Sequence, residues 1–179
     1  MVKFSFLKLL DETILPLLLL AGSRFLGVFL AALIFPVGFS FGNNPDLPSL
    51  PFIRFEGSGD LYLANSVSWG LVGLVLAISF GYVLFRILNF HGDRVHPKES
   101  SRLHNRNLEF LVIDSHEAFH QGISWVLAGL LSTCLVAGDF LSGQLSAAAF
   151  GFVFGVNAFL VLGFWWSVAG SRGLERKKV

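Results

Sequence analysis

The chain alternates long apolar runs with short polar segments. The apolar runs cover residues 13–42, 67–88, 110–137 and 144–168. Each run approaches or exceeds the roughly 20 residues that a helix needs to cross the hydrocarbon core of a bilayer. Because spanning segments must satisfy their backbone hydrogen bonds internally, the pattern predicts an all-α membrane protein. We expect a four-transmembrane-helix bundle that forms a single domain over residues 1–179.

The first apolar run is interrupted by Gly22-Ser23-Arg24 and allows two interpretations. Either one tilted helix crosses over residues 17–42, or residues 25–42 cross and residues 13–22 are half-immersed. A charged side chain in the middle of a bilayer is costly. We therefore place Arg24 near the lipid headgroups at the start of the crossing.

The polar segments define the ends and the connections. Residues 1–12 mix apolar and charged side chains, which indicates a possible short interfacial helix at the N-terminus. Residues 43–66 hold three of the six prolines and are expected to form an ordered loop or an interfacial hairpin. Residues 89–107 form the only long polar stretch and are predicted to be a loop. Residues 138–143 are predicted to form a tight turn, and the tail at 169–179 is basic.

Composition agrees with a membrane protein. The chain is 54% hydrophobic and contains 20 phenylalanines. Only 14% of its residues are charged, whereas a soluble domain has roughly a quarter. Cys134 is the single cysteine, which excludes an intrachain disulfide and a cysteine-based metal site. Because Cys134 lies in an apolar run, we expect a buried thiol.

The distribution of positive charge predicts the orientation. Four crossings place the N-terminus, the 89–107 segment and the C-terminus on one side of the membrane. That side holds eleven of the thirteen basic residues: Lys3, Lys8, Arg86, Arg94, Lys98, Arg102, Arg106, Arg172, Arg176, Lys177 and Lys178. The other side holds only Arg54. Since basic loops are retained in the cytoplasm, both termini should be cytoplasmic, in a bacterial inner membrane.

Small residues recur at four-residue spacing in the last two crossings. They are Gly129, Thr133 and Ala137 in the third crossing, and Ala147, Gly151 and Gly155 in the fourth. Small residues allow helices to approach closely in a membrane. We expect these two faces to meet within the bundle; the alternative is a homo- or hetero-oligomer through the face of the fourth crossing. Asn157, deep in that crossing, must find a polar partner inside the bundle.

The third crossing begins with the motif His116-Glu117-Ala118-Phe119-His120. On a helix, this spacing places the two imidazoles one turn apart on the same face. His116 and His120 are therefore candidate zinc ligands, and Glu117 is a candidate general base for a zinc-bound water. The third ligand would come from the preceding polar segment. The candidates there are His104, His96, His91, Asp93 and Glu99.

The motif resembles that of the membrane-embedded zinc metalloproteases, whose HExxH helix lies in the bilayer near the cytoplasm. The resemblance covers this motif alone and implies a zinc-dependent hydrolase. In that family the third ligand is an aspartate of a downstream Asn-Pro-Asp triplet. The matching triplet here, Asn44-Pro45-Asp46, lies upstream and on the predicted opposite side of the membrane. The third ligand of the family therefore has no counterpart in this chain.

A structural role is the principal alternative to a metal site. Histidine and glutamate at the start of a helix often hydrogen-bond to neighbouring loops or headgroups. We expect a membrane component or scaffold with a histidine-rich cytoplasmic face, and the alternative is the zinc-dependent hydrolase. Handling of protons or ions is a further alternative function. The 89–107 segment is a candidate site for anionic lipid, whereas its dispersed cations and interleaved acids do not indicate nucleic-acid binding.

Overall fold

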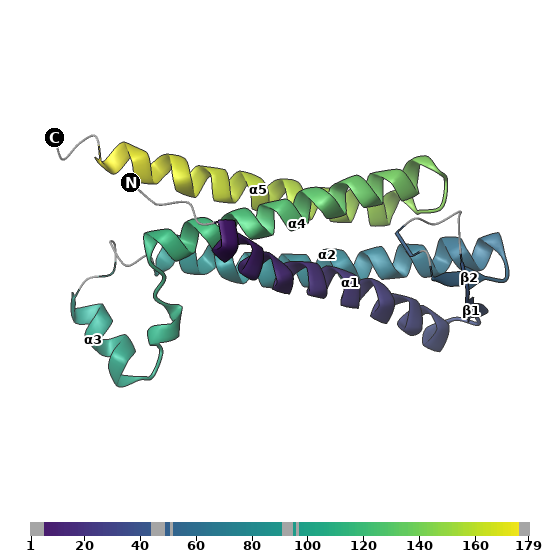
Figure 1. The fold of residues 1–179 in the computed structure, drawn as a ribbon, viewed down its shortest axis with the longest axis horizontal. Coiled ribbons are helices and arrows are strands. Elements are labelled where there is room, and N and C mark those ends of the chain that lie inside the picture. The colour runs from purple at the N-terminus through teal and green to yellow at the C-terminus, as the bar shows by residue number, and fades with distance from the viewer. Residues whose placement is uncertain (1–5, 44–48, 51, 91–94, 96, 176–179) are drawn as a thin grey trace.

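The computed structural model describes residues 6–43, 49–50, 52–90, 95 and 97–175. Four long helices lie alongside one another (Figure 1): α1 (Phe6–Ile34), α2 (Ser58–Asn89), α4 (Ser115–Leu141) and α5 (Ala147–Glu175). All four are long and apolar enough to cross a membrane, with mean hydropathies of 1.6 to 2.3 over their most apolar parts. The predicted helical class and the expected four spanning-length helices are confirmed.

The first helix differs from its prediction at both ends. α1 is already helical at Phe6 and runs through Gly22-Ser23-Arg24 without a break, so the described residues contain no separate interfacial helix. It ends at Ile34 instead of residue 42. Proline disfavours the helical conformation in the residue before it and lacks a backbone N–H. Pro36 therefore ends the helix.

A small hairpin joins the first two helices. Strand β1 (Phe39–Phe41) pairs antiparallel with β2 (Ile53–Phe55), with Phe39 opposite Phe55. A hairpin was one of the two expected forms of this connection, but β1 lies before residue 43, within the predicted first crossing. α2 also begins at Ser58, nine residues before the predicted start at 67. The hairpin packs on the bundle because Ile53 and Leu50 are buried against Val28 of α1.

The polar segment between α2 and α4 is more ordered than a loop. It contains helix α3 (Pro97–Asn105) and a short 3₁₀ helix, η1 (Glu109–Leu111). Proline suits the first position of a helix, where the missing N–H has no partner in any case. In Figure 1, α3 projects from the end of the bundle opposite the hairpin.

Helix α4 begins with a side-chain cap. The carboxylate of Asp114 accepts a hydrogen bond from the backbone N–H of Glu117, at 2.6 Å.

The last two helices are joined by a short turn that begins later than predicted. α4 ends at Leu141 and α5 begins at Ala147. Asp139 therefore lies in the last turn of α4, and not in the turn expected at 138–143.

The core runs along α2, which packs against α1, α4 and α5. Trp69, Leu76 and Phe80 of α2 are fully buried, and Phe80 stacks on Trp125 of α4 with ring centroids 6.1 Å apart. Between 22% and 39% of the residues in the most apolar part of each span are buried. Most of the remaining apolar surface faces outward, which is compatible with lipid contact. Cys134 is on this exposed surface, so the expectation of a buried thiol is wrong.

The contact between α4 and α5 uses Asn157 and not the small face of α5. The Nδ2 of Asn157 donates to Ser132 Oγ (2.7 Å) and Thr133 Oγ1 (3.0 Å), which confirms the expected internal partner. Ala147, Gly151 and Gly155 are exposed, and no atom lies within 4 Å of where a Cβ would stand on either glycine. The expected meeting of the two small faces is therefore wrong, because the buried face of α5 carries the larger residues Val153, Asn157 and Leu160.

Candidate functional site

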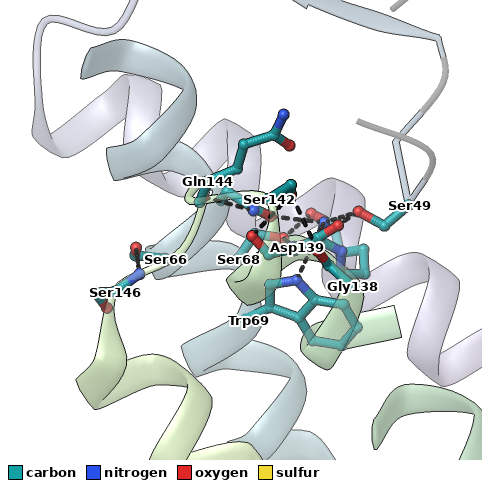
Figure 2. A network of polar contacts seen from close by, with 11 residues as sticks. Ser49, Ser66, Ser68, Trp69, Gly138, Asp139, Ser142, Gln144 and Ser146 are labelled. Atoms are coloured by element: carbon teal, nitrogen blue, oxygen red, sulfur yellow. Dashed lines mark hydrogen bonds and ion pairs between the residues drawn. The ribbon is translucent and has the colours of Figure 1, made fainter. Parts of the chain in front are cut away.

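A buried polar network lies at the end of the bundle that holds the α4–α5 turn (Figure 2). Its acceptor is the Oδ2 of Asp139. This oxygen accepts hydrogen bonds from Ser49 Oγ at 2.7 Å and from Trp69 Nε1 at 2.7 Å. It also pairs with Nη2 of Arg24 at 3.4 Å. Asp139 is thereby bonded to three segments that are distant in the sequence.

Arg24 is the cation of this network and is only 2% exposed. Its Nη1 donates to Ser68 Oγ at 2.9 Å, and its Nη2 donates to Asn65 Oδ1 at 2.8 Å and Ser49 Oγ at 2.7 Å. The guanidinium carbon lies 4.2 Å from the centroid of the Trp69 ring, close enough for a cation–π interaction. Its Nε has no hydrogen-bond partner among the described residues.

The network ties together α1, α2, the last turn of α4 and the connection that carries Ser49. Asn65 extends it to the α4–α5 turn, because its Nδ2 donates to the carbonyl oxygen of Gln144 at 2.8 Å. Nearby, the N–H of Ser146 donates to Ser66 Oγ at 3.0 Å. Most polar atoms of this network form hydrogen bonds to another segment of the chain. Such bonds compensate for the cost of removing charges from water.

The pairing of Arg24 with Asp139 was not predicted. We expected Arg24 near the headgroups at the start of the first crossing. It instead lies midway along the candidate span Glu12–Ile34 and pairs with a residue at the far end of α4. The sequence did hold a signal for this pair, because Arg24 and Asp139 are a cation and an acid that are each isolated in an apolar segment. Intramembrane charges commonly pair with one another.

The histidine motif lies at the other end of α4. The rings of His116 and His120 have centroids 4.2 Å apart, as the helical spacing predicted. His120 is fully buried, and its Nδ1 is 2.8 Å from the carbonyl oxygen of His116. Ser124, one turn further on, is also buried and accepts a hydrogen bond from Thr13 of α1 at 3.2 Å. His120 and Ser124 therefore face the interior of the bundle.

Glu117, the candidate general base, is held by a cation and an amide. Its Oε1 accepts from Gln121 Nε2 at 2.9 Å and lies 3.6 Å from Arg86 Nη2. Arg86 in turn donates from Nε to the carbonyl oxygen of Leu111 at 3.2 Å, and from Nη2 to that of Val112 at 3.4 Å. This cluster fastens the segment before α4 to the end of α2.

The candidate third ligands do not join the histidine pair in the described part of the chain. His104 is exposed, and its Nδ1 contacts the carboxylate of Glu109. His91, His96 and Asp93 lie outside the described residues. Within the described ranges, no group of three or more His, Cys, Asp or Glu side chains is arranged to hold a metal ion.

Two cavities adjoin α3. The first, which we call the α3 cavity, measures about 420 Å³ and is lined by Phe90, Arg102, Leu103, Arg106 and Leu108, among others. The second measures about 480 Å³, and His104 and Glu109 contribute to its wall. Both therefore lie at the same end of the bundle as the histidine motif and away from the Arg24–Asp139 network.

Comparison with known proteins adds no functional assignment. No family model matches the chain, and no curated protein or solved structure shows significant similarity to it.

Proposed function

We propose that this protein is a non-catalytic component or scaffold of a membrane assembly, placed in a bacterial inner membrane with both termini in the cytoplasm. The Arg24–Asp139 network carries this proposal. Arg24 and Asp139 are both almost fully buried, and they bond to side chains of α2 and of the connection before it. Such a network fixes the arrangement of helices, and the bundle then offers rigid apolar faces to lipid or to other subunits.

The histidine end supports the same proposal. The Glu117 carboxylate bonds Gln121 and lies near Arg86. A general base for hydrolysis needs access to a water molecule. The contacts of Glu117 Oε1 are instead those of a residue that fastens α4 to α2.

A zinc-dependent hydrolase is the second candidate, favoured by the close rings of His116 and His120. If the proton resides on Nδ1 of His120, it is donated to the His116 carbonyl oxygen and leaves Nε2 as a lone-pair donor. A metal-ligating histidine commonly has this arrangement. Glu117 would be the base, and the third ligand would come from His91, His96 or His104.

Metal analysis of the purified protein separates the two candidates. The scaffold proposal predicts no stoichiometric zinc after growth in zinc-replete medium. It also predicts that His116→Ala and Glu117→Gln leave unchanged the size of the complex extracted in mild detergent. About one zinc per chain, lost in His116→Ala but kept in Glu117→Gln, would instead establish the hydrolase site.

A further inference from the structure

We propose that the α3 cavity binds the phosphate headgroup of an anionic phospholipid. This inference deepens the proposed function, because it rests on the placement of the four helices in a membrane. The cavity has a volume of about 420 Å³, and its wall combines arginines with apolar side chains. A phospholipid presents the same combination, a phosphate next to a glycerol backbone and acyl chains.

The cavity lies where a bilayer surface would lie. Phe90, in its wall, directly follows Asn89, the last residue of the candidate span Ser58–Asn89. Large apolar side chains are exposed in the elements that precede and follow α3. Phe85 and Leu88 are exposed in the last turns of α2, and Phe110 of η1 is 61% exposed. Acyl chains contacting these side chains would have their headgroups at the level of the cavity.

The C-terminal end of α3 forms part of the cavity wall and has a defined backbone conformation. The chain leaves α3 in a Schellman arrangement, in which Leu108 N–H bonds the Leu103 carbonyl oxygen at 2.9 Å and Asn107 N–H bonds that of His104 at 3.0 Å. Asn107 adopts the left-handed conformation that this motif requires, with φ of 55°. Leu103 and Leu108 both line the cavity, and Phe90, in the same wall, is tied to the bundle because its carbonyl oxygen accepts from Ile113 N–H at 3.0 Å.

The charge of the cavity favours an anion. Arg102 and Arg106 are four residues apart, and both line the cavity, together with one acid, Glu99. Among the described residues of the wall, two arginines and one glutamate give a net charge of +1. The planar guanidinium group matches the oxygens of a phosphate in a bidentate manner. The apolar part of the wall would contact the glycerol and the first methylene groups of the lipid.

The test measures binding of phosphatidylglycerol and phosphatidylcholine to the purified full-length protein by native mass spectrometry in mild detergent. We expect the wild type to prefer phosphatidylglycerol. The double variant Arg102→Gln/Arg106→Gln should bind it on the order of twenty-fold more weakly, since each basic residue near the surface contributes about a fivefold factor. Glu99→Gln should bind it several-fold more tightly, because it removes an acid from the described part of the wall.

The matched control is Lys98→Gln/Arg54→Gln, which also removes two positive charges but alters no residue of the cavity wall. It should keep most of the preference for phosphatidylglycerol. Equal weakening by the control would overturn the proposal, because binding would then depend on total charge. Displacement of the lipid by glycerol phosphate at millimolar concentration would also overturn it, since the cavity would then be a site for a soluble phosphate. Neither result would bear on the scaffold proposal, which is tested by the metal content of the protein and the size of its complex.

Discussion

At the scale of single residues, the arrangement around Arg24 explains how an apolar bundle accommodates a buried charge. Removing an ion from water costs several kcal/mol even after relaxation of the protein. Here the cost is offset by Asp139, by side-chain oxygens of Ser49, Asn65 and Ser68, and by the face of an indole ring. Loss of one charged partner would leave the other buried without compensation.

A double-mutant cycle tests this ion pair. We expect Arg24→Gln and Asp139→Asn each to reduce the free energy of unfolding by about 3–5 kcal/mol, because each leaves one buried charge unpaired. The double variant should lose less than the sum of the two, by about 1–3 kcal/mol. Thermal unfolding in detergent micelles gives the three values.

Arg54→Gln is the control for this cycle, because Arg54 is an exposed arginine on the hairpin. A surface substitution of this kind should stay within about 0.5 kcal/mol of the wild type. Additive losses from Arg24→Gln and Asp139→Asn would show that the two charges do not stabilise each other.

At the scale of helices, the crossing of α1 and α2 depends on a close backbone approach. A Cβ added to Gly27 would lie 2.4 Å from the Cα of Ser68, a distance that requires one helix to move. Ser68 is also the residue that bonds the side chain and the carbonyl oxygen of Arg24. The close approach and the polar network therefore depend on the same point of contact.

Gly27→Ala should separate α1 from α2 and weaken the network. We expect a loss of about 1–3 kcal/mol, the usual cost of overpacking a well-packed contact. Gly22→Ala on the same helix is the matched control, because no atom lies within 4 Å of its added Cβ. That substitution should be neutral or stabilising by up to about 1 kcal/mol, since alanine favours helices more than glycine does.

The measurement is again thermal unfolding in detergent, on both glycine variants in parallel. Equal effects of the two substitutions would contradict a specific close approach at Gly27. A larger loss for Gly22→Ala would place the critical contact elsewhere on α1.

At the scale of the whole molecule, the charge distribution predicts an orientation in the membrane that can be measured directly. The end of the bundle with α3 has several basic residues, whereas the hairpin end has Arg54 together with Glu56 and Asp60. Basic segments are retained in the cytoplasm. We expect α3 to face the cytoplasm and the hairpin to face the opposite side.

Cysteine labelling tests the orientation in a Cys134→Ala background. Ser58→Cys and Asn105→Cys place single thiols at exposed positions at opposite ends of the bundle. A membrane-impermeant maleimide should label position 58 in spheroplasts and position 105 only after the membrane is disrupted. The reverse pattern would invert the orientation, and labelling of both positions before disruption would contradict the membrane-spanning arrangement.

Much of the helical architecture could be predicted from sequence, because it depends on local composition. The apolar runs located four helices, and the spacing of His116 and His120 placed their rings on one face. The helix ends were less predictable. Pro36 ends α1 well before residue 42, and Asp139 stays helical where a turn was expected. Terminal residues depend on caps and packing as much as on hydrophobicity.

The candidate site was harder to predict than the fold. Asp139 and Arg24 are 115 residues apart, and their pairing depends on how α1 and α4 dock. The direction of the small residues of α5 was equally hard to predict. Their spacing is clear in the sequence, but the direction that Gly151 and Gly155 face depends on which side of α5 packs better against its neighbours.

The number of long apolar helices and the clustering of histidines and basic residues around residues 86–120 can be read from the amino-acid order alone. These properties are local, since helix formation and hydrophobicity act over a few consecutive turns. The packing of the helices was needed to show that Arg24 and Asp139 are partners, that Glu117 is near Arg86, and that α3 and the end of α2 line a cavity. Each of these depends on contacts between distant segments, which form only when the helices pack.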